Sequence, residues 1–184
     1  IVFVYIMNDL KKILDGCCPW DKDYQLYSFE NEDEKLAFKK WFVDNAVHYS
    51  IDKQYKFEPK FLSEMIPGGC YGNGQYISSV LSIGYVEGLV LPNGRYVFDE
   101  YIPHGFNIIN GKVIDYSYKK ITEENPYHLP EMPTEYWGIE IPSEYLSINN
   151  SDKTKKPSVF HRPLLLQYWR DNVKIKGYFP KKCV

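Results

Sequence analysis

Cys70 lies in the segment IPGGCYGNGQY, in which Pro-Gly-Gly is followed by residues at helical spacing. This pattern predicts a helix with Cys70 at its N-terminus and Gly84 at its end. A thiol attacks as the thiolate, and the unpaired N–H groups of a helix N-terminus favour negative charge. The neighbouring glycines would let a substrate carbonyl approach backbone N–H groups that form an oxyanion hole. Cys70 is therefore a candidate nucleophile.

A base for this nucleophile is found downstream. The Asn110-Gly111 pair predicts a two-residue hairpin turn, which fixes the register of the two strands beside it. In this register His104 faces Ser117 and Phe106 faces Asp115. Because side chains alternate between faces, His104 and Asp115 are diagonal neighbours on one face, with backbones about 7–8 Å apart. An imidazole and a carboxylate can form a hydrogen bond across that distance.

These residues predict a catalytic triad. Cys70 would attack, His104 would take and return the proton, and Asp115 would fix the imidazole tautomer. Asn107 is excluded as the orienting residue because the same register places it on the opposite face. Four further residues are candidates for binding the substrate or the oxyanion: Tyr71, Asn73, Gln75 and Glu87.

Two of these candidates have alternative interpretations. The helical spacing of Asn73 from Ile77 points its amide inward, where it must satisfy backbone groups, so a structural role is favoured. Glu87 is expected on a strand, where it either binds a substrate amine or pairs with Arg95.

The elements that must position these residues are expected as helices first and antiparallel strands afterwards. Asn31 can cap a helix, with Glu34 closing a capping box. The other expected elements are a strand at 1–6, helices at 9–15, 61–66 and 163–171, three or four β segments within 85–118, and a loop at 122–133. We predict one α+β domain over residues 1–184, in which the Cys70 helix packs on an antiparallel sheet carrying His104 and Asp115. A mobile loop is expected at 147–158.

Composition narrows the function classes. The 184 residues include 22 Lys and Arg and 24 Asp and Glu, a formal net charge of −2, so charge does not indicate nucleic acid binding. Four cysteines do not make a disulfide framework at this length, and a cytoplasmic location is expected.

Cys17-Cys18 lacks the gap of zinc-binding pairs, so no metal is predicted, and no cofactor motif is present. The opening apolar run is too short for a membrane helix. Oligomeric state stays open.

Five segments carry a resemblance to known proteins: C-Y-G-N-G (70–74), Y-V-E-G (85–88), P-H-G-F-N (103–107), V-I-D-Y (113–116) and E-Y-W-G-I-E-I-P (135–142). The order Cys, His, Asp resembles the papain-like and transglutaminase-like superfamily. The set is similar to a group of small bacterial and phage proteins in it, which carry C-x-x-N-A, Y-V-E-G, H-A-W and V-I-D-P-T. The resemblance spans about residues 68–142. Gly105-Phe106 replaces Ala-Trp and Tyr116-Ser117 replaces Pro-Thr, while the three polar positions are kept.

The resemblance implies a papain-like fold and a thiol-dependent acyl-transfer enzyme that works through a thioester on a peptide, protein or other amide or ester. Peptidase, amidase, deamidase and transglutaminase outcomes all remain open. One alternative is a non-catalytic binding or accessory protein of a phage or mobile element, with residues 1–60 and 145–184 as its partner surface. GGCY is also similar to the arylamine N-acetyltransferases, whose Arg before the glycines and acidic residue after the Cys are missing here.

Overall fold

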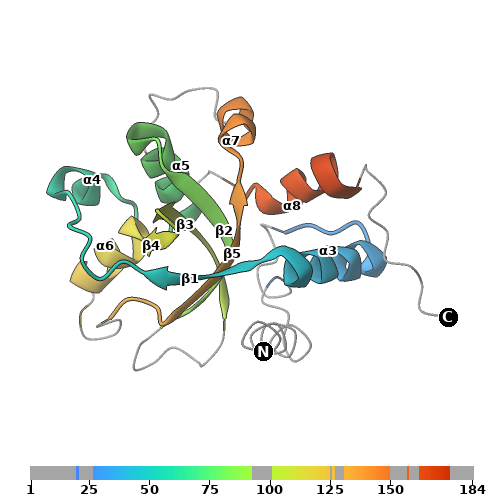
Figure 1. The fold of residues 1–184 in the computed structure, drawn as a ribbon, viewed down its shortest axis with the longest axis horizontal. Coiled ribbons are helices and arrows are strands. Elements are labelled where there is room, and N and C mark those ends of the chain that lie inside the picture. The colour runs from blue at the N-terminus through green and yellow to red at the C-terminus, as the bar shows by residue number, and fades with distance from the viewer. Residues whose placement is uncertain are drawn as a thin grey trace.

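The computed structural model describes residues 20, 27–92, 101–124, 126, 131–149, 157 and 162–174. Helices surround a central group of strands (Figure 1). In chain order the elements are α3 (Glu32–Asn45), β1 (Val47–Ile51), α4 (Pro59–Glu64), α5 (Cys70–Leu81), β2 (Gly84–Leu91), β3 (Ile102–Ile109), β4 (Lys112–Ile114), α6 (Tyr116–Glu124), β5 (Glu135–Ile141), α7 (Ser143–Asn149), α8 (Leu165–Trp169) and the π-helical turn η1 (Arg170–Lys174).

The strands form a closed barrel in the order β1-β4-β3-β2-β5. The α+β class is confirmed, but the expected antiparallel sheet is wrong in one respect, because β1 pairs with β4 in parallel. β1 also pairs antiparallel with β5 and so closes the barrel. The sequence did not predict β1, since only one of its five residues is buried and its apolar pattern is weak.

The predicted hairpin register is confirmed. Asn110 and Gly111 both have positive φ angles, of 51° and 74°, as a type I′ turn requires. Asn107 pairs with Ile114, two positions from the turn on each strand. The register does not continue as expected, however, because β4 ends at Ile114 and α6 begins at Tyr116. Ser117 therefore lies on a helix, and the predicted pairing of Ser117 with His104 is wrong.

The helix predicted from Asn31 is present as α3. The Asn31 side chain accepts a hydrogen bond from the Glu34 N–H at 2.9 Å and caps the helix. The expected capping box is not formed, because the Glu34 carboxylate accepts instead from the Glu30 N–H at 2.6 Å. Glu34 also pairs with Arg170 and Lys174, and these ion pairs join α3 to η1.

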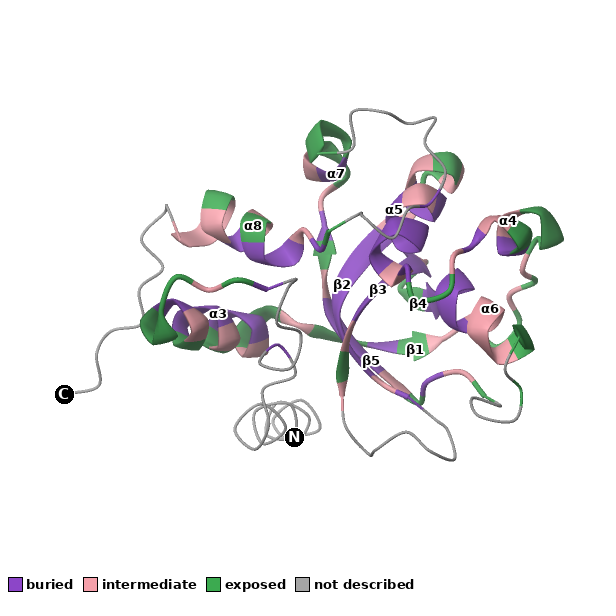
Figure 2. Cartoon of the chain, turned by 180° about the vertical axis from the view of Figure 1, so that it is seen from behind, coloured by how far each residue is buried: buried purple, intermediate pink, exposed green. Residues whose placement is uncertain are grey.

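Two of the three buried apolar clusters fill the barrel interior and attach its outer helices. The first fills the interior and includes at least one side chain from every strand: Tyr49, Val86, Val90, Phe106, Ile108, Val113, Tyr118 and Tyr136. The second lies outside β2 and β5, where α3 and α8 pack through Phe38, Trp41 and Trp169. Figure 2 shows burial concentrated in β2, β3 and the inner side of α5. The barrel thus provides a rigid support for α5 and its N-terminus.

Several expectations lie partly or wholly outside the described residues. These include the strand at 1–6, the helix at 9–15 and most of the loop at 147–158, whose first three residues belong to α7. The helix expected at 163–171 is present as α8 followed by η1. Segment 122–133, expected as a loop, begins with the last turn of α6. Among the helices that the structure describes, none is both long and apolar enough to cross a membrane.

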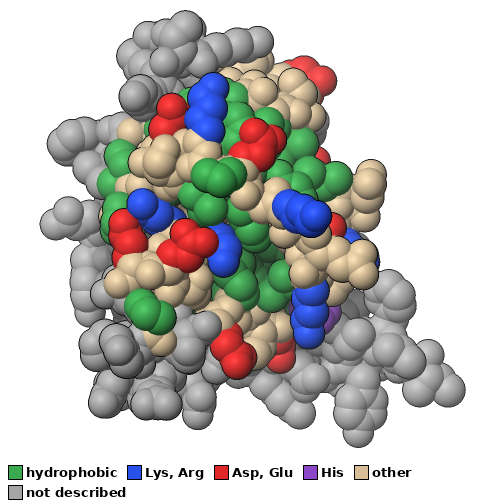
Figure 3. All heavy atoms as spheres, turned by 90° about the vertical axis from the view of Figure 1, so that its left-hand side faces the viewer, with side chains coloured by type: hydrophobic (Ala, Val, Ile, Leu, Met, Phe, Trp, Pro, Cys, Tyr) green, Lys and Arg blue, Asp and Glu red, His purple; other side chains and the backbone are tan. Residues whose placement is uncertain are grey.

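The face that carries α4 and α6 has charges of both signs around hydrophobic side chains (Figure 3). Lys119 pairs with Glu123 and Lys120 with Glu124, at 3.2 and 3.0 Å. A cavity of about 710 Å³ opens beside α6, between β1 and residues 131–134. On this described face the positive charges are balanced by acidic neighbours rather than collected into a basic patch.

Candidate active site

Cys70 is the first residue of α5, as predicted, and its thiol is free and partly exposed. The turn before it is closed by a hydrogen bond from Gly69 N–H to the Ile66 carbonyl at 3.0 Å. Gly68, at φ 76°, supplies the left-handed backbone that this turn needs. No side chain caps the helix at Gly69, so the Cys70 N–H at the helix start has no capping side chain there.

The start of α5 lies very close to β3. A Cβ atom built on Gly105 would lie 3.2 Å from Tyr71 Cα and 2.8 Å from the Tyr85 hydroxyl. Only glycine therefore allows this approach without displacement. The approach brings the residue after Cys70 against the residue after His104, so it aligns the thiol with the imidazole.

His104 and Asp115 are in direct contact. His104 Nε2 lies 2.8 Å from Asp115 Oδ2, and the two residues are only 3% and 1% exposed. Since Nε2 is used by the carboxylate, Nδ1 is the ring nitrogen left for Cys70. The diagonal contact inferred from the hairpin register is thus present, although Asp115 reaches it from the residue between β4 and α6 rather than from within a strand.

The environment of His104 favours its charged form. Burial lowers the pKa of His104, but the charges of Asp115 and Cys70 and hydrogen bonds to both side chains raise it, and the net result is a pKa of about 10. A protonated His104 can donate to Asp115 through Nε2 and to the Cys70 sulfur through Nδ1.

Asp115 is held by three donors from three elements. In addition to His104 on β3, the Tyr118 N–H of α6 donates to Oδ1 at 3.0 Å, and the Tyr136 hydroxyl of β5 donates to Oδ2 at 3.0 Å. Asp115 therefore caps α6 with one oxygen and contacts His104 with the other. Sequence reasoning missed Tyr136, and the only available signal was its place in the E-Y-W-G segment.

Asn73 connects the bend before Cys70 to α6. Its amide accepts from the Ile66 N–H at 3.0 Å, donates to the Ile66 carbonyl at 2.9 Å, and donates to Ser117 Oγ at 3.0 Å. These contacts satisfy backbone groups, which agrees with the structural interpretation. Ser117 lies two residues after Asp115, so Asn73 also links the segment of the nucleophile to the segment of the carboxylate.

The other two candidates on α5 are buried. Gln75 is 2% exposed, and its amide nitrogen donates to the Arg162 carbonyl at 3.0 Å and to the Tyr85 hydroxyl at 3.4 Å. Tyr71 is 5% exposed, and burial followed by the neighbouring Tyr27 raises the pKa of its hydroxyl well above the usual value. The observed hydrogen bonds of Gln75 thus run toward Arg162 and Tyr85, and no described contact directs either side chain to a substrate.

Glu87 has a role that neither interpretation anticipated. Its carboxylate is fully buried and accepts hydrogen bonds from the N–H groups of Leu164 (2.7 and 2.9 Å) and Leu165 (2.8 Å) and from the Tyr85 hydroxyl (2.7 Å). Glu87 therefore attaches the start of α8 to the barrel, which leaves no open carboxylate for a substrate amine. Arg95, the other expected partner, lies outside the described residues.

Asn107 lies on the face opposite to His104, as the register predicted. Its amide donates to the carbonyls of Gly74 and Gly84 at 2.9 and 3.2 Å and so holds α5 on the barrel. Asn107 is thus a support for the helix rather than the orienting residue of the imidazole.

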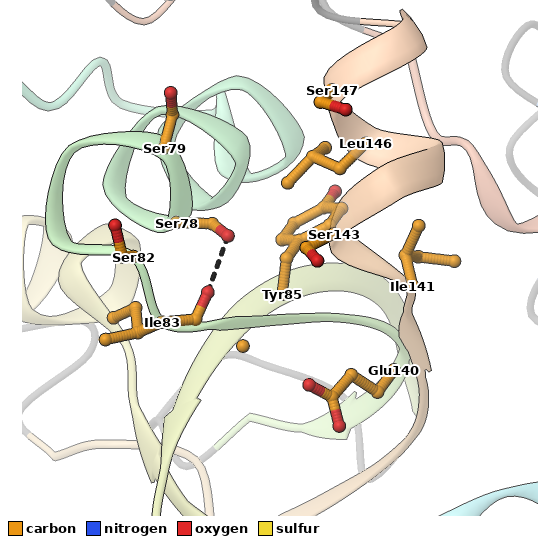
Figure 4. Close-up of a pocket in the computed structure, with 11 residues that line it drawn as sticks. Ser78, Ser79, Ser82, Ile83, Tyr85, Glu140, Ile141, Ser143, Leu146 and Ser147 are labelled. Atoms are coloured by element: carbon orange, nitrogen blue, oxygen red, sulfur yellow. Dashed lines mark hydrogen bonds between the residues drawn. The ribbon is translucent and has the colours of Figure 1, made fainter.

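A second cavity, of about 500 Å³, lies at the other end of α5, between α5, β2, β5 and α7 (Figure 4). Five of its lining residues are serines: Ser78, Ser79, Ser82, Ser143 and Ser147. Ser78, which donates to the Ile83 carbonyl at 2.6 Å, is about 12 Å along the helix axis from Cys70. This cavity is therefore separate from the Cys70 site.

Metal coordination finds no support within the described part of the chain, where no group of three His, Cys, Asp or Glu side chains is placed to hold an ion. Cys17 and Cys18 lie outside that part. The described residues thus define a helix-covered five-stranded barrel in which a thiol at a helix start, an imidazole and a carboxylate converge. Comparisons with protein-family models, curated proteins and solved structures gave no match.

Proposed function

We propose that this protein is a thiol-dependent acyl-transfer enzyme of papain-like type, with Cys70 as nucleophile, His104 as proton donor and acceptor, and Asp115 as orienting residue. The observation that carries the proposal is the position of the buried His104 ring. It contacts Asp115 at 2.8 Å through Nε2, and the partly exposed Cys70 thiol is the other group that raises the pKa of the ring. This order of groups is the one that nucleophilic thiol catalysis requires.

The reaction would proceed in two steps. The Cys70 thiolate attacks an amide or ester carbonyl, a carbon–sulfur bond forms, and the carbonyl electron pair moves to the oxygen. When this pair returns, the bond to the amine or alcohol breaks, and the leaving group takes the proton from His104 Nδ1. A thioester remains on Cys70. Water or an amine then attacks the thioester, His104 takes the proton of that nucleophile, and the thiolate is released.

The developing oxyanion would be stabilised by the backbone of α5. The N–H of Cys70 lies in the first turn of α5, where N–H groups have no hydrogen-bond partner inside the helix. The helix dipole adds positive potential at the same place. Backbone donors of this kind stabilise tetrahedral intermediates without reorganisation. The buried amide of Gln75 is not needed for this role, because the N-terminal turn already supplies donors.

The test is the rate of iodoacetamide labelling of Cys70, followed by peptide mass spectrometry from about pH 4 to pH 10. We expect labelling to persist below about pH 7 in the wild type, because the protonated His104 stabilises the thiolate. In His104→Ala the labelling rate should rise only near pH ~8.5, which is the pKa of an ordinary thiol. The matched control is His48→Ala, since His48 is exposed and packs at a tilt against Trp137.

An inert Cys70, or one that labels with the same profile in the wild type and in His104→Ala, contradicts the proposal. If the wild type behaves as expected, acylation by activated esters follows as the next assay. A stable mass increase on Cys70 that is absent from Cys70→Ser identifies the thioester. The non-catalytic alternative predicts an unactivated thiol, so the same experiment separates the two functions.

A further inference from the structure

We propose that Tyr136 is a positioning residue of this site, whose hydroxyl holds the Asp115 carboxylate turned toward His104. The inference rests on the proposed function and adds a fourth residue to it. Tyr136 is fully buried on β5. Its hydroxyl donates to Asp115 Oδ2 at 3.0 Å, and this is the oxygen that His104 Nε2 contacts at 2.8 Å.

Packing fixes the direction of the Tyr136 hydroxyl. The Tyr136 ring meets Phe106 edge to face, with centroids 5.0 Å apart, and Phe106 lies parallel to the His104 ring at 6.5 Å. The three rings therefore pack one after another, with Phe106 between Tyr136 and His104. A rigid ring with one polar atom pays little conformational entropy to hold that atom against the carboxylate.

The shared oxygen has a chemical consequence. A hydroxyl donor on Asp115 Oδ2 fixes the direction of the carboxylate. Because His104 Nε2 contacts the same oxygen, the donor also fixes which side of the imidazole remains for Cys70. Every titratable group with a described interaction with Asp115 belongs to this arrangement: His104 from β3, Tyr118 from α6, Tyr136 from β5 and, through the imidazole, Cys70 from α5.

The test compares Tyr136→Phe with a matched control, Tyr49→Phe. Both tyrosines are buried in the barrel and pack edge to face on Phe106, but Tyr49 makes no described contact with Asp115. We expect iodoacetamide labelling of Cys70 near pH 6 to fall about tenfold in Tyr136→Phe, because the carboxylate loses a donor that holds it toward His104. Labelling in Tyr49→Phe should stay within about twofold of the wild type.

A second measurement uses the unmodified protein. In proton NMR spectra, the Tyr136 hydroxyl proton and the His104 Nε2 proton should both exchange slowly and show a mutual nuclear Overhauser effect, since they share one acceptor. Absence of that effect overturns the inference, as does equal labelling in the two tyrosine variants. If the wild type and His104→Ala behave as proposed while Tyr136→Phe does not, only the role of Tyr136 is wrong. If Cys70 of the wild type is not labelled at low pH, both the proposed function and the role of Tyr136 are wrong.

Discussion

Glu87 allows a sharp test of how the barrel holds its C-terminal helix. Burial raises the pKa of Glu87, and hydrogen bonds from Leu164, Tyr85 and Leu165 lower it again, so the net value is about 7 against an ordinary 4.5. Between these two pH values the folded state binds more protons than the unfolded state. The free energy of unfolding must therefore decrease as pH rises through this window, by about 3 kcal/mol in total.

The assay is urea unfolding of the wild type and Glu87→Gln at several values between about pH 4 and pH 8, with the linear extrapolation in denaturant. The amide of the variant does not titrate, so the stability difference, wild type minus Glu87→Gln, should fall by about 3 kcal/mol over the window. Titration of every other group cancels in the difference. A difference that stays constant or increases with pH would refute the reasoning.

Glu34→Gln is the matched control for this experiment. The hydrogen bond from Arg170 is the largest effect on Glu34; despite some opposition from burial, its pKa is lowered from 4.5 to about 2. Its contribution to stability is therefore present above pH 4.5 and is lost only as pH falls toward 2. Across the window of Glu87, the difference between the wild type and Glu34→Gln should be flat.

Two further outcomes can be measured by the same unfolding assay. Gly88→Ala should lower the free energy of unfolding by about 3 kcal/mol or more, because the new Cβ would lie 2.0 Å from the Trp137 carbonyl oxygen in the neighbouring strand. A decrease of less than about 1 kcal/mol would show that β2 and β5 can separate. Arg170→Ala removes two contacts to Glu34, at 2.9 and 2.8 Å, and should cost about 2 kcal/mol at pH 7. This decrease in the free energy of unfolding should become smaller near pH 2, where Glu34 becomes protonated. A decrease that does not depend on pH would count against the ion pair.

The parts of the fold that follow local rules could be predicted from the sequence. The Asn31 cap, the helix start at Cys70 and the Asn110-Gly111 turn each depend on residues within one turn of the chain. The pairing of Asn107 with Ile114 then follows from the turn type alone. These local features were sufficient to place an imidazole near a carboxylate.

The closure of the barrel could not be predicted, because it depends on contacts between distant segments. β1 is short and largely exposed, and it acquires its strand structure by pairing with β4 and β5, more than sixty residues away. The helix after Asp115 had a local signal in the capping aspartate, but the hairpin pattern masked it. Tyr136 and Glu87 gained their partners only when the barrel and α8 came together.

The energetic cost of the site supports a functional reason for its geometry. A buried ion pair such as His104 and Asp115 loses hydration that its mutual attraction only partly restores, so apolar side chains of similar volume would stabilise the barrel at least as well. Stability therefore does not explain why the chain directs three donors to Asp115 and turns the other side of His104 to a free thiol. The proposed acyl-transfer function would explain it, because an imidazolium held by the carboxylate would stabilise an attacking thiolate.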